Sequence, residues 1–177
     1  MNVQVVEPRA DILVESTRSI GYTFESALAD IIDNSIGNGA THIDVRFSSI
    51  IPRYIAIIDD GCGMTPDELI IAMRYGSKNV NDQRAESDLG RFGLGLKTAS
   101  LSQCRKLTVI SKKNNVISAA SWDLDFIIAQ QGWSLKVYDH EEMVNQYNKA
   151  IPGILDELNR YESGTIVIWE DFDKMLE

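Results

Sequence analysis

The sequence predicts one α/β domain, a two-layer sandwich of a mixed, mainly antiparallel sheet covered by helices on one face. Segments with strand-like alternation follow one another through short connections, which is typical of antiparallel hairpins. Strong helix-start signals precede two other segments, and a glycine-rich turn leads into a third. The order of helix, strand, strand, helix, helix and then mostly strands differs from the alternating order of a doubly wound Rossmann sheet.

The first long helix is expected to begin near Thr23, a good N-cap residue, and to end at Gly37–Gly39. Residues 41–47 alternate between polar and apolar side chains, which predicts a half-buried strand, and residues 54–60 predict a second strand. The apolar side of the first strand would carry Ile43, Val45 and Phe47.

The next helix has a clear start. Thr65 and Glu68 match a capping box, and Pro66 occupies the first helical position. Residues 76–91 are polar and nearly free of large apolar side chains, so they predict a long surface loop of the kind that forms lids. The glycine-rich turn and the third helix follow this loop.

The second half of the chain is expected to be mostly strands. The remaining predicted segments are a hairpin of residues 106–111 and 116–122, a strand at 132–138, a helical stretch at 139–161 interrupted by Pro152 and Gly153, and a last strand at 164–169. Residues 1–19 are expected to form a strap over the domain edge or an arm toward another subunit, and residues 20–177 the domain itself.

Composition restricts the class of protein. The chain has 177 residues, a formal net charge of -9 and no apolar run near the roughly 18 residues that span a bilayer. Cys62 and Cys104 show no metal-ligand spacing, and no secretory signal is visible, so a cytoplasmic location with reduced thiols is expected. The acidic balance lacks the basic footprint of nucleic-acid binders, so DNA contact would need other regions or partners. No membrane partner is expected.

Three motifs carry the chemistry. Asp30 and Asn34 lie four residues apart on the first helix and share one face; by itself this pattern more often forms a solvated polar surface. The second strand runs into D-D-G-C-G-M, and G-R-F-G-L-G-L-K opens the third helix. The latter spacing is reversed from the dinucleotide fingerprint and follows a loop rather than a strand, and the sequence contains no P-loop motif. Three glycines before a helix are equally consistent with a tight turn or with phosphate binding.

Taken in order, the three motifs resemble the GHKL ATPase superfamily, which includes gyrase B, heat-shock chaperones, histidine kinases, MutL and MORC proteins. The resemblance covers Ala27–Ser100, with a weaker match at Thr165, and is greatest to MutL-type and prokaryotic MORC-like domains. It implies a Bergerat-type fold that binds ATP or ADP, hydrolyses ATP with Mg²⁺, and closes as an ATP-dependent homodimeric clamp. It also implies a transducer-like domain after residue 177, from which a lysine would reach the terminal phosphate.

The resemblance assigns roles position by position. Asp30 would be the general base, Asn34 the magnesium ligand, and Asp59 the acceptor for the adenine amino group. Gly61 and Gly63 would let the backbone approach the base.

The phosphate end of the site would lie at the start of the third helix, where the helix dipole favours anions. Lys97 would reach a phosphate, and Thr165 would contact the adenine region through water. Backbone N–H groups would come from Gly93, Leu94, Gly95 and Leu96. The expected ATP-binding set is completed by Met64, Gly76, Ser77, Gly90, Arg91 and Phe92.

Two positions depart from the family pattern. Asp30 stands where the family has Glu, and its side chain is shorter by roughly 1.5 Å of reach. Gly37 stands where MutL-like sequences have Asp. Slow hydrolysis, or a nucleotide-binding regulatory module with little or no hydrolysis, therefore remains an alternative. A histidine-kinase-like catalytic domain is a further alternative, which the missing phosphoacceptor helix disfavours.

Overall fold

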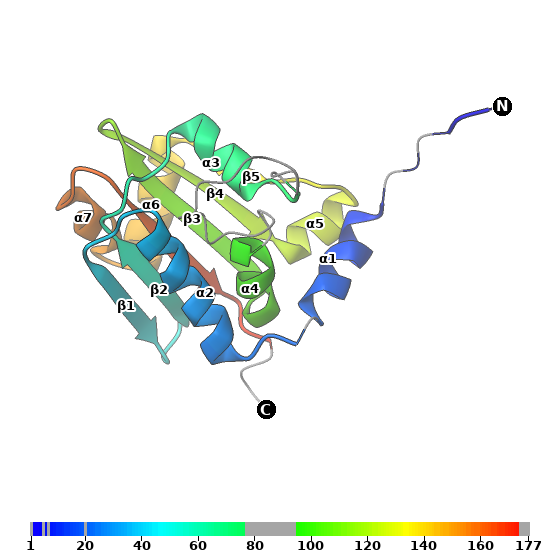
Figure 1. Cartoon of the computed structure of the whole chain (residues 1–177), viewed down its shortest axis with the longest axis horizontal. Coiled ribbons are helices and arrows are strands. Elements are labelled where there is room, and N and C mark those ends of the chain that lie inside the picture. Colours follow the sequence, from blue (N-terminus) through cyan, green and yellow to red (C-terminus); the bar gives the residue numbers. More distant parts are fainter. Residues whose placement is uncertain (1, 5, 7, 20, 77–94, 174–177) are drawn as a thin grey trace.

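The computed structural model describes residues 2–4, 6, 8–19, 21–76 and 95–173. Figure 1 shows helices packed across a twisted sheet, with the N-terminal segment running away from the domain. The helices are α1 Ala10–Arg18, α2 Phe24–Gly37, α3 Pro66–Met73, α4 Gly95–Gln103, α5 Leu124–Gln130, α6 His140–Ala150 and α7 Ile154–Asn159. The strands are β1 Ile43–Ser48, β2 Tyr54–Asp59, β3 Lys106–Lys113, β4 Val116–Asp123, β5 Lys136–Tyr138 and β6 Gly164–Glu170.

The six strands form one sheet in the order β1-β2-β6-β3-β4-β5, and each pair of neighbours is antiparallel. β6, the last strand in sequence, lies between β2 and β3 at the centre of the sheet. This position brings Thr165 of β6 opposite Asp59 of β2 on one side and Ser111 of β3 on the other. Three segments that are distant in sequence therefore meet at one end of the central strands.

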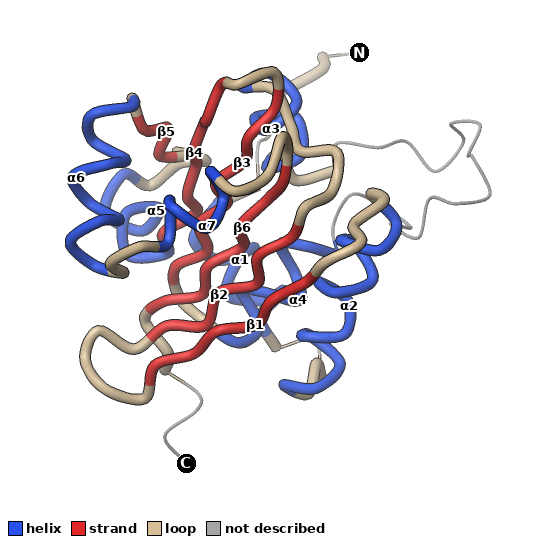
Figure 2. The backbone as a smooth tube through the Cα atoms, turned by 90° about the vertical axis from the view of Figure 1, so that its left-hand side faces the viewer, coloured by secondary structure: helices blue, strands red, loops and turns tan. Residues whose placement is uncertain are grey.

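Each face of the sheet carries its own hydrophobic core. Successive residues of a strand point to opposite faces, so Ile55 and Ile57 of β2 join the core beneath α1 to α5, while Ala56 and Ile58 join the core beneath α6 and α7. Figure 2 shows α6 and α7 on one side of the sheet and α2 and α4 on the other.

The predicted fold class is confirmed as an α/β domain built on an antiparallel sheet, with two corrections. The sheet contains no parallel pair among the described strands, whereas a mixed sheet was predicted. The helices were predicted on one face, but α6 and α7 cover the second face through side chains such as Met143 and Leu158. The apolar spacing of these helices predicts that they pack on the sheet but carries no information about which face they reach.

The capping predictions agree with the structure. The Thr23 side chain accepts a hydrogen bond from the backbone of Ser26 at the start of α2. At the start of α3, Thr65 and Glu68 form the full capping box, with Pro66 as the first helical residue. These contacts depend on residues three apart in sequence, which is why local pattern suffices to predict them.

The sequence did not predict a helix within residues 1–19. Residues 10–18 form α1, which buries Ala10 and Val14 in the first core. The buried Arg18 at the end of α1 donates from Nε to the Leu101 carbonyl of α4 at 2.7 Å and pairs with Asp173 just after β6. These contacts attach α1 to α4 and to the segment that follows the last strand.

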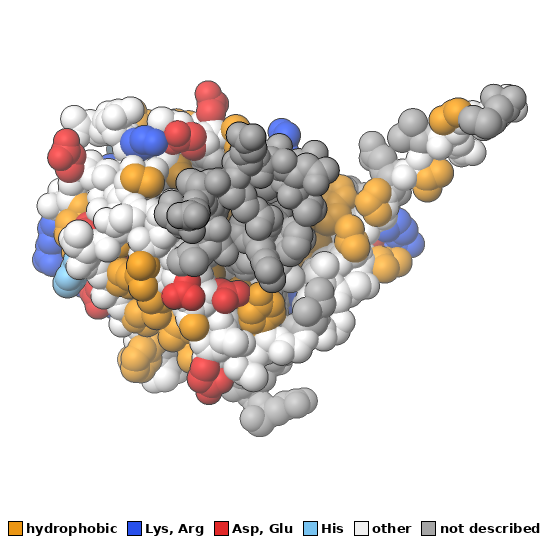
Figure 3. Space-filling view, in the orientation of Figure 1, with side chains coloured by type: hydrophobic (Ala, Val, Ile, Leu, Met, Phe, Trp, Pro, Cys, Tyr) orange, Lys and Arg blue, Asp and Glu red, His pale blue; other side chains and the backbone are white. Residues whose placement is uncertain are grey.

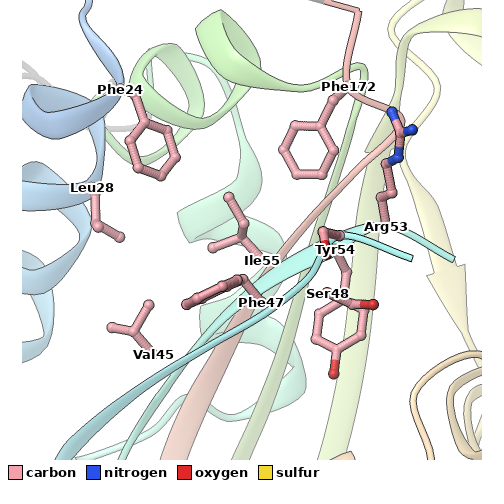
Figure 4. Close-up of a pocket in the computed structure, with 10 residues that line it drawn as sticks. Phe24, Leu28, Val45, Phe47, Ser48, Arg53, Tyr54, Ile55 and Phe172 are labelled. Atoms are coloured by element: carbon pink, nitrogen blue, oxygen red, sulfur yellow. The ribbon is translucent and has the colours of Figure 1, made fainter. Parts of the chain in front are cut away.

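Strand β1 lies at the edge of the sheet and is less covered than predicted. Val45 and Phe47 share one face as expected, yet their side chains are 37% and 78% exposed. They line an apolar pocket of about 550 Å³ together with Phe24 and Leu28 of α2. In Figure 4 these side chains, with those of Ile55 and Phe172, surround the open space. Helix α2 lies over β2 rather than over β1, so the pocket stays open at the sheet edge.

Among the described residues, no helix has both the length and the apolar character needed to cross a membrane. The two cysteines are free thiols; Cys62 is exposed and Cys104 is buried.

Candidate functional site

Asp59 ends β2 with a side chain that the fold holds in one position. It is 6% exposed. Its Oδ2 accepts a hydrogen bond from the Ser35 hydroxyl at 2.7 Å, and its Oδ1 accepts one from the Gly61 N–H at 2.9 Å. Burial raises the pKa of the Asp59 carboxyl, and these two hydrogen bonds oppose the shift. The result is an oriented acceptor group at the end of β2.

The neighbouring acid, Asp60, has a different environment. Its carboxylate accepts hydrogen bonds from the backbone N–H groups of Thr41 and His42 and from the Thr41 hydroxyl, at 2.7–2.8 Å. These bonds lower the pKa of Asp60 to about 2, the Thr41 hydroxyl contributing most. Asp60 therefore holds the loop before β1 in place, whereas Asp59 is buried and bonded to α2 through Ser35.

Close backbone packing around Asp59 requires glycine. Gly63 has a φ of +60°, and a Cβ on it would lie 2.0 Å from the carbonyl oxygen of Lys112. A Cβ on Gly164 would lie 2.2 Å from the carbonyl oxygen of Asp59. No side chain fits at either position, so the loop after β2 sits directly on the ends of β3 and β6.

Ser111 of β3 connects the three strands at this end of the sheet. Its buried hydroxyl accepts a hydrogen bond from the Met64 N–H at 2.8 Å and lies 3.1 Å from both the Gly164 carbonyl oxygen and the Thr165 hydroxyl. Met64, expected in the ATP-binding set, and Thr165, expected in the adenine region, are therefore joined through the Ser111 hydroxyl.

Helix α2 carries the other expected groups. Asp30 and Asn34 are both half-buried and share one face of the helix. The Asp30 Oδ2 accepts a hydrogen bond from the Tyr22 hydroxyl at 2.7 Å. The side-chain amide of Asn34 has no hydrogen-bond partner among the described residues, so its oxygen is available as a ligand. Ser35, the residue after Asn34, turns inward and reaches Asp59.

Helix α4 packs against α2 and begins at Gly95. Leu96 is half-buried against the first core. Lys97 is only 1% exposed, and its Nζ donates a hydrogen bond to the Ala72 carbonyl in the last turn of α3 at 2.6 Å. In this structure the ammonium thus contacts the end of α3, from which the chain continues to Gly76. Sequence alone presents Lys97 as a first-turn lysine, and its contact with the Ala72 carbonyl joins residues 25 apart in sequence.

Part of the predicted phosphate site lies outside the described residues. Gly76, the last residue before the undescribed segment, has a φ of +68°. The predicted site residues outside the described part of the chain are Ser77, Gly90, Arg91, Phe92, Gly93 and Leu94.

The face formed by α2 is acidic. Figure 3 shows acidic side chains over α2, in agreement with the exposed Glu25 and Asp33 and the half-buried Asp30. A polyanion would need a cation to bind here. Within the described residues, no group of three or more His, Cys, Asp or Glu side chains converges on a metal site. The free amide oxygen of Asn34 fits a single protein ligand to Mg²⁺, whose other ligands would be phosphate oxygens and waters.

The structure brings together Asp59, Gly61, Gly63, Met64 and Thr165 at the strand ends, next to the helix that carries Asp30 and Asn34. Sequence reasoning missed three contributing residues: Tyr22, Ser35 and Ser111.

Only Ser35 had a usable signal among these three. It continues the buried stripe of Ala27 and Ile31 at helical spacing, and a hydroxyl in an apolar stripe implies a buried partner. Nothing in the local pattern links Tyr22 to Asp30 or Ser111 to Met64.

Comparison with known proteins gives consistent matches. Residues 22–165 match the family described as histidine kinase-, DNA gyrase B- and HSP90-like ATPases. The chain is 33% identical over 130 residues to the DNA mismatch repair protein MutL of Rhizorhabdus wittichii, covering 72% of this chain and 19% of that protein.

Two eukaryotic proteins are similar over a shorter region. ATPase morc-1 of Caenorhabditis elegans is 30% identical over 95 residues, which is 53% of this chain and 11% of that protein. ATPase MORC2B of Mus musculus is 31% identical over 96 residues, which is 52% of this chain and 9% of that protein. The chain spans about a fifth or less of the length of these relatives.

Proposed function

Because the chain belongs to the family of histidine kinase-, DNA gyrase B- and HSP90-like ATPases, we propose that it binds ATP with Mg²⁺ and hydrolyses it. The roles of Asp59, Asp30 and Asn34 follow from the chemistry of their side chains. The proposal includes slow turnover, since Asp30 is one methylene shorter than the glutamate expected at its position.

One observation carries this proposal. Helix α2 presents Asp30 and Asn34 on one face, and its next residue, Ser35, is hydrogen-bonded to Asp59 at 2.7 Å. The helix therefore fixes the positions of Asn34 and of Asp30, one turn further along, relative to the adenine acceptor that Ser35 holds. Such fixed positions are what the binding of a nucleotide by both its base and its phosphates requires.

Base recognition would come from Asp59. Its oxygens are oriented by Ser35 and Gly61 and can accept a hydrogen bond from the exocyclic amino group of adenine. Guanine presents a carbonyl oxygen at the same position, so an ionised carboxylate repels it. Gly63 allows the loop after β2 to pack on β3, where a side chain would collide, and the backbone of this loop would then approach the base.

Hydrolysis would depend on Asp30. Its carboxylate takes a proton from water as the water oxygen bonds to the terminal phosphorus; the bond to the bridging oxygen breaks, and ADP leaves. Asn34 would hold Mg²⁺, which offsets the negative charge of the phosphates when bound. The N-terminus of α4, which begins at Gly95, would lie at the phosphate end, where the helix dipole favours anions.

The test is single-turnover hydrolysis of magnesium-ATP by the wild-type chain and by Asp30→Asn, with the dissociation constant of a non-hydrolysable analogue measured for both. We expect Asp30→Asn to lose at least about a hundredfold in rate while binding the analogue as tightly as wild type. Equal rates for the two proteins would overturn the assignment of Asp30.

A second candidate function is a nucleotide-binding regulatory module without useful turnover. The short acid at position 30 favours this alternative, because its carboxylate reaches less far than the glutamate expected there. Tight binding of magnesium-ATP with no hydrolysis over hours would support it over the ATPase.

We make two further proposals, on dimerisation and on contact with DNA. An ATP-dependent homodimeric clamp rests on the family resemblance, and sedimentation velocity with and without a magnesium-loaded ATP analogue would test it. One relative is named as a DNA mismatch repair protein. With a net charge of -9 here, we propose that any DNA contact involves other regions or partners.

A further inference from the structure

We propose that Tyr22 is a positioning residue that holds Asp30 in the orientation needed to activate water. This inference rests on the proposed ATPase function and concerns a residue that no motif includes. Its basis is the hydrogen bond of 2.7 Å between the Tyr22 hydroxyl and the Asp30 Oδ2.

Tyr22 is itself held in place by its surroundings. It lies just before the Thr23 N-cap of α2, and its half-buried ring packs against the first hydrophobic core. Its backbone carbonyl accepts a hydrogen bond from the Gln103 Nε2 at 3.3 Å. Gln103 is 6% exposed at the end of α4 and also donates to the Ser102 hydroxyl. The tyrosine therefore links α4, which begins at the proposed phosphate end, to the acid on α2.

The hydrogen bond restricts the orientation of the Asp30 carboxylate. A half-exposed aspartate on a helix surface can adopt several rotamers, and only some direct an oxygen toward a water above Asn34. Binding of Oδ2 by Tyr22 removes this freedom and leaves Oδ1 to accept the proton. The hydrogen bond to Asp30 also raises the pKa of the Tyr22 hydroxyl, so that the group stays protonated and remains a donor.

The test uses Tyr22→Phe, which removes the hydroxyl and keeps the packed ring. Tyr54→Phe is the matched control, because the half-buried Tyr54 has no hydrogen-bond partner for its hydroxyl among the described residues. Single-turnover hydrolysis, the dissociation constant of a magnesium-loaded ATP analogue and the thermal midpoint are measured for each variant. We expect Tyr22→Phe to lower the rate about tenfold with an unchanged dissociation constant, and Tyr54→Phe to match wild type.

A double-mutant cycle with Asp30→Glu separates positioning from a general structural effect. The longer acid places its oxygens differently, so removal of the Tyr22 hydroxyl in the Asp30→Glu background should change the rate less than about twofold. An equal loss in both backgrounds, or a loss that follows analogue affinity and thermal midpoint, would overturn the positioning role.

The remaining outcomes are also decisive. A Tyr22→Phe rate equal to or above that of wild type, with Asp30→Asn inactive, would refute the role of Tyr22 and leave the ATPase proposal intact. A wild-type chain that binds magnesium-ATP and never hydrolyses it would refute both proposals together.

Discussion

Replacing Gly63 by alanine tests how closely the loop after β2 packs against β3 and β6. Gly63 is buried with a φ of +60°, and an added Cβ would lie 2.0 Å from the Lys112 carbonyl oxygen and 3.1 Å from the Gly164 N. Both neighbours are backbone atoms of the paired strands β3 and β6, where Lys112 pairs with Gly164. Neither can move aside as a flexible side chain would.

Two contributions set the size of the effect. An alanine at positive φ costs about 1–2 kcal/mol. The collision requires the loop or the strand pair to shift by more than about 1 Å, and overpacking of this kind costs about 1–3 kcal/mol. The lower entropy of the unfolded alanine chain offsets about 0.5 kcal/mol. The free energy of unfolding should therefore fall by about 3 kcal/mol.

Gly153→Ala is the control, because Gly153 has a φ of +79° and no atom within 4 Å of the added Cβ. It carries the conformational cost without the collision, so its loss should be about 1 kcal/mol. Urea unfolding followed by circular dichroism gives both values, provided the m-value is unchanged. A loss for Gly63→Ala no larger than that for Gly153→Ala would refute the packing argument.

Three further substitutions test the acids and the amide of the site. Asp59→Asn should abolish ATP binding, which calorimetry measures. It should leave the free protein at least as stable as wild type at pH 7 in urea unfolding, because burial raises the pKa of Asp59 and its ionised form therefore opposes folding above that pKa. In wild type, the free energy of unfolding should fall as pH drops from near 3.8 toward 2, since the pKa of Asp60 is lowered to about 2 in the folded state. Asp60→Asn should lack this contribution at higher pH and lose less stability over the same range; an unchanged acid transition would contradict this. Asn34→Ala should remove the magnesium dependence of nucleotide binding, and a persisting requirement would place the metal elsewhere.

Sequence predicted the parts of the fold that depend on near neighbours. The capping box of α3 and the hairpin of β3 and β4 follow from residues a few positions apart, and both are present. Helix α5 was not predicted, because it has only seven residues and begins directly after β4 with Asp123 as its cap. The position of α6 and α7 on the second face depends on contacts between distant segments, which a local pattern does not record.

In the candidate site, too, local patterns predicted some features and contacts between distant segments set the others. Asp59 was singled out over Asp60 from its place in the motif, and the structure gives the two acids distinct environments. Lys97 was expected near a phosphate, whereas in the structure it is buried and its ammonium donates a hydrogen bond to the Ala72 carbonyl at the end of α3. The bond from Tyr22 to Asp30 joins residues on either side of the α2 N-cap and has no counterpart in any sequence pattern used.

The central claim is that the end of β2 and helix α2 form a site that recognises adenine. Calorimetric titration of the wild-type chain with magnesium-ATP and with magnesium-GTP tests it most directly. We expect the chain to bind ATP at least about tenfold more tightly than GTP, a difference of about 1.4 kcal/mol, because the Asp59 carboxylate accepts a hydrogen bond from an amino group and repels a carbonyl oxygen. Equal affinity for the two nucleotides, or no ATP binding, would contradict it.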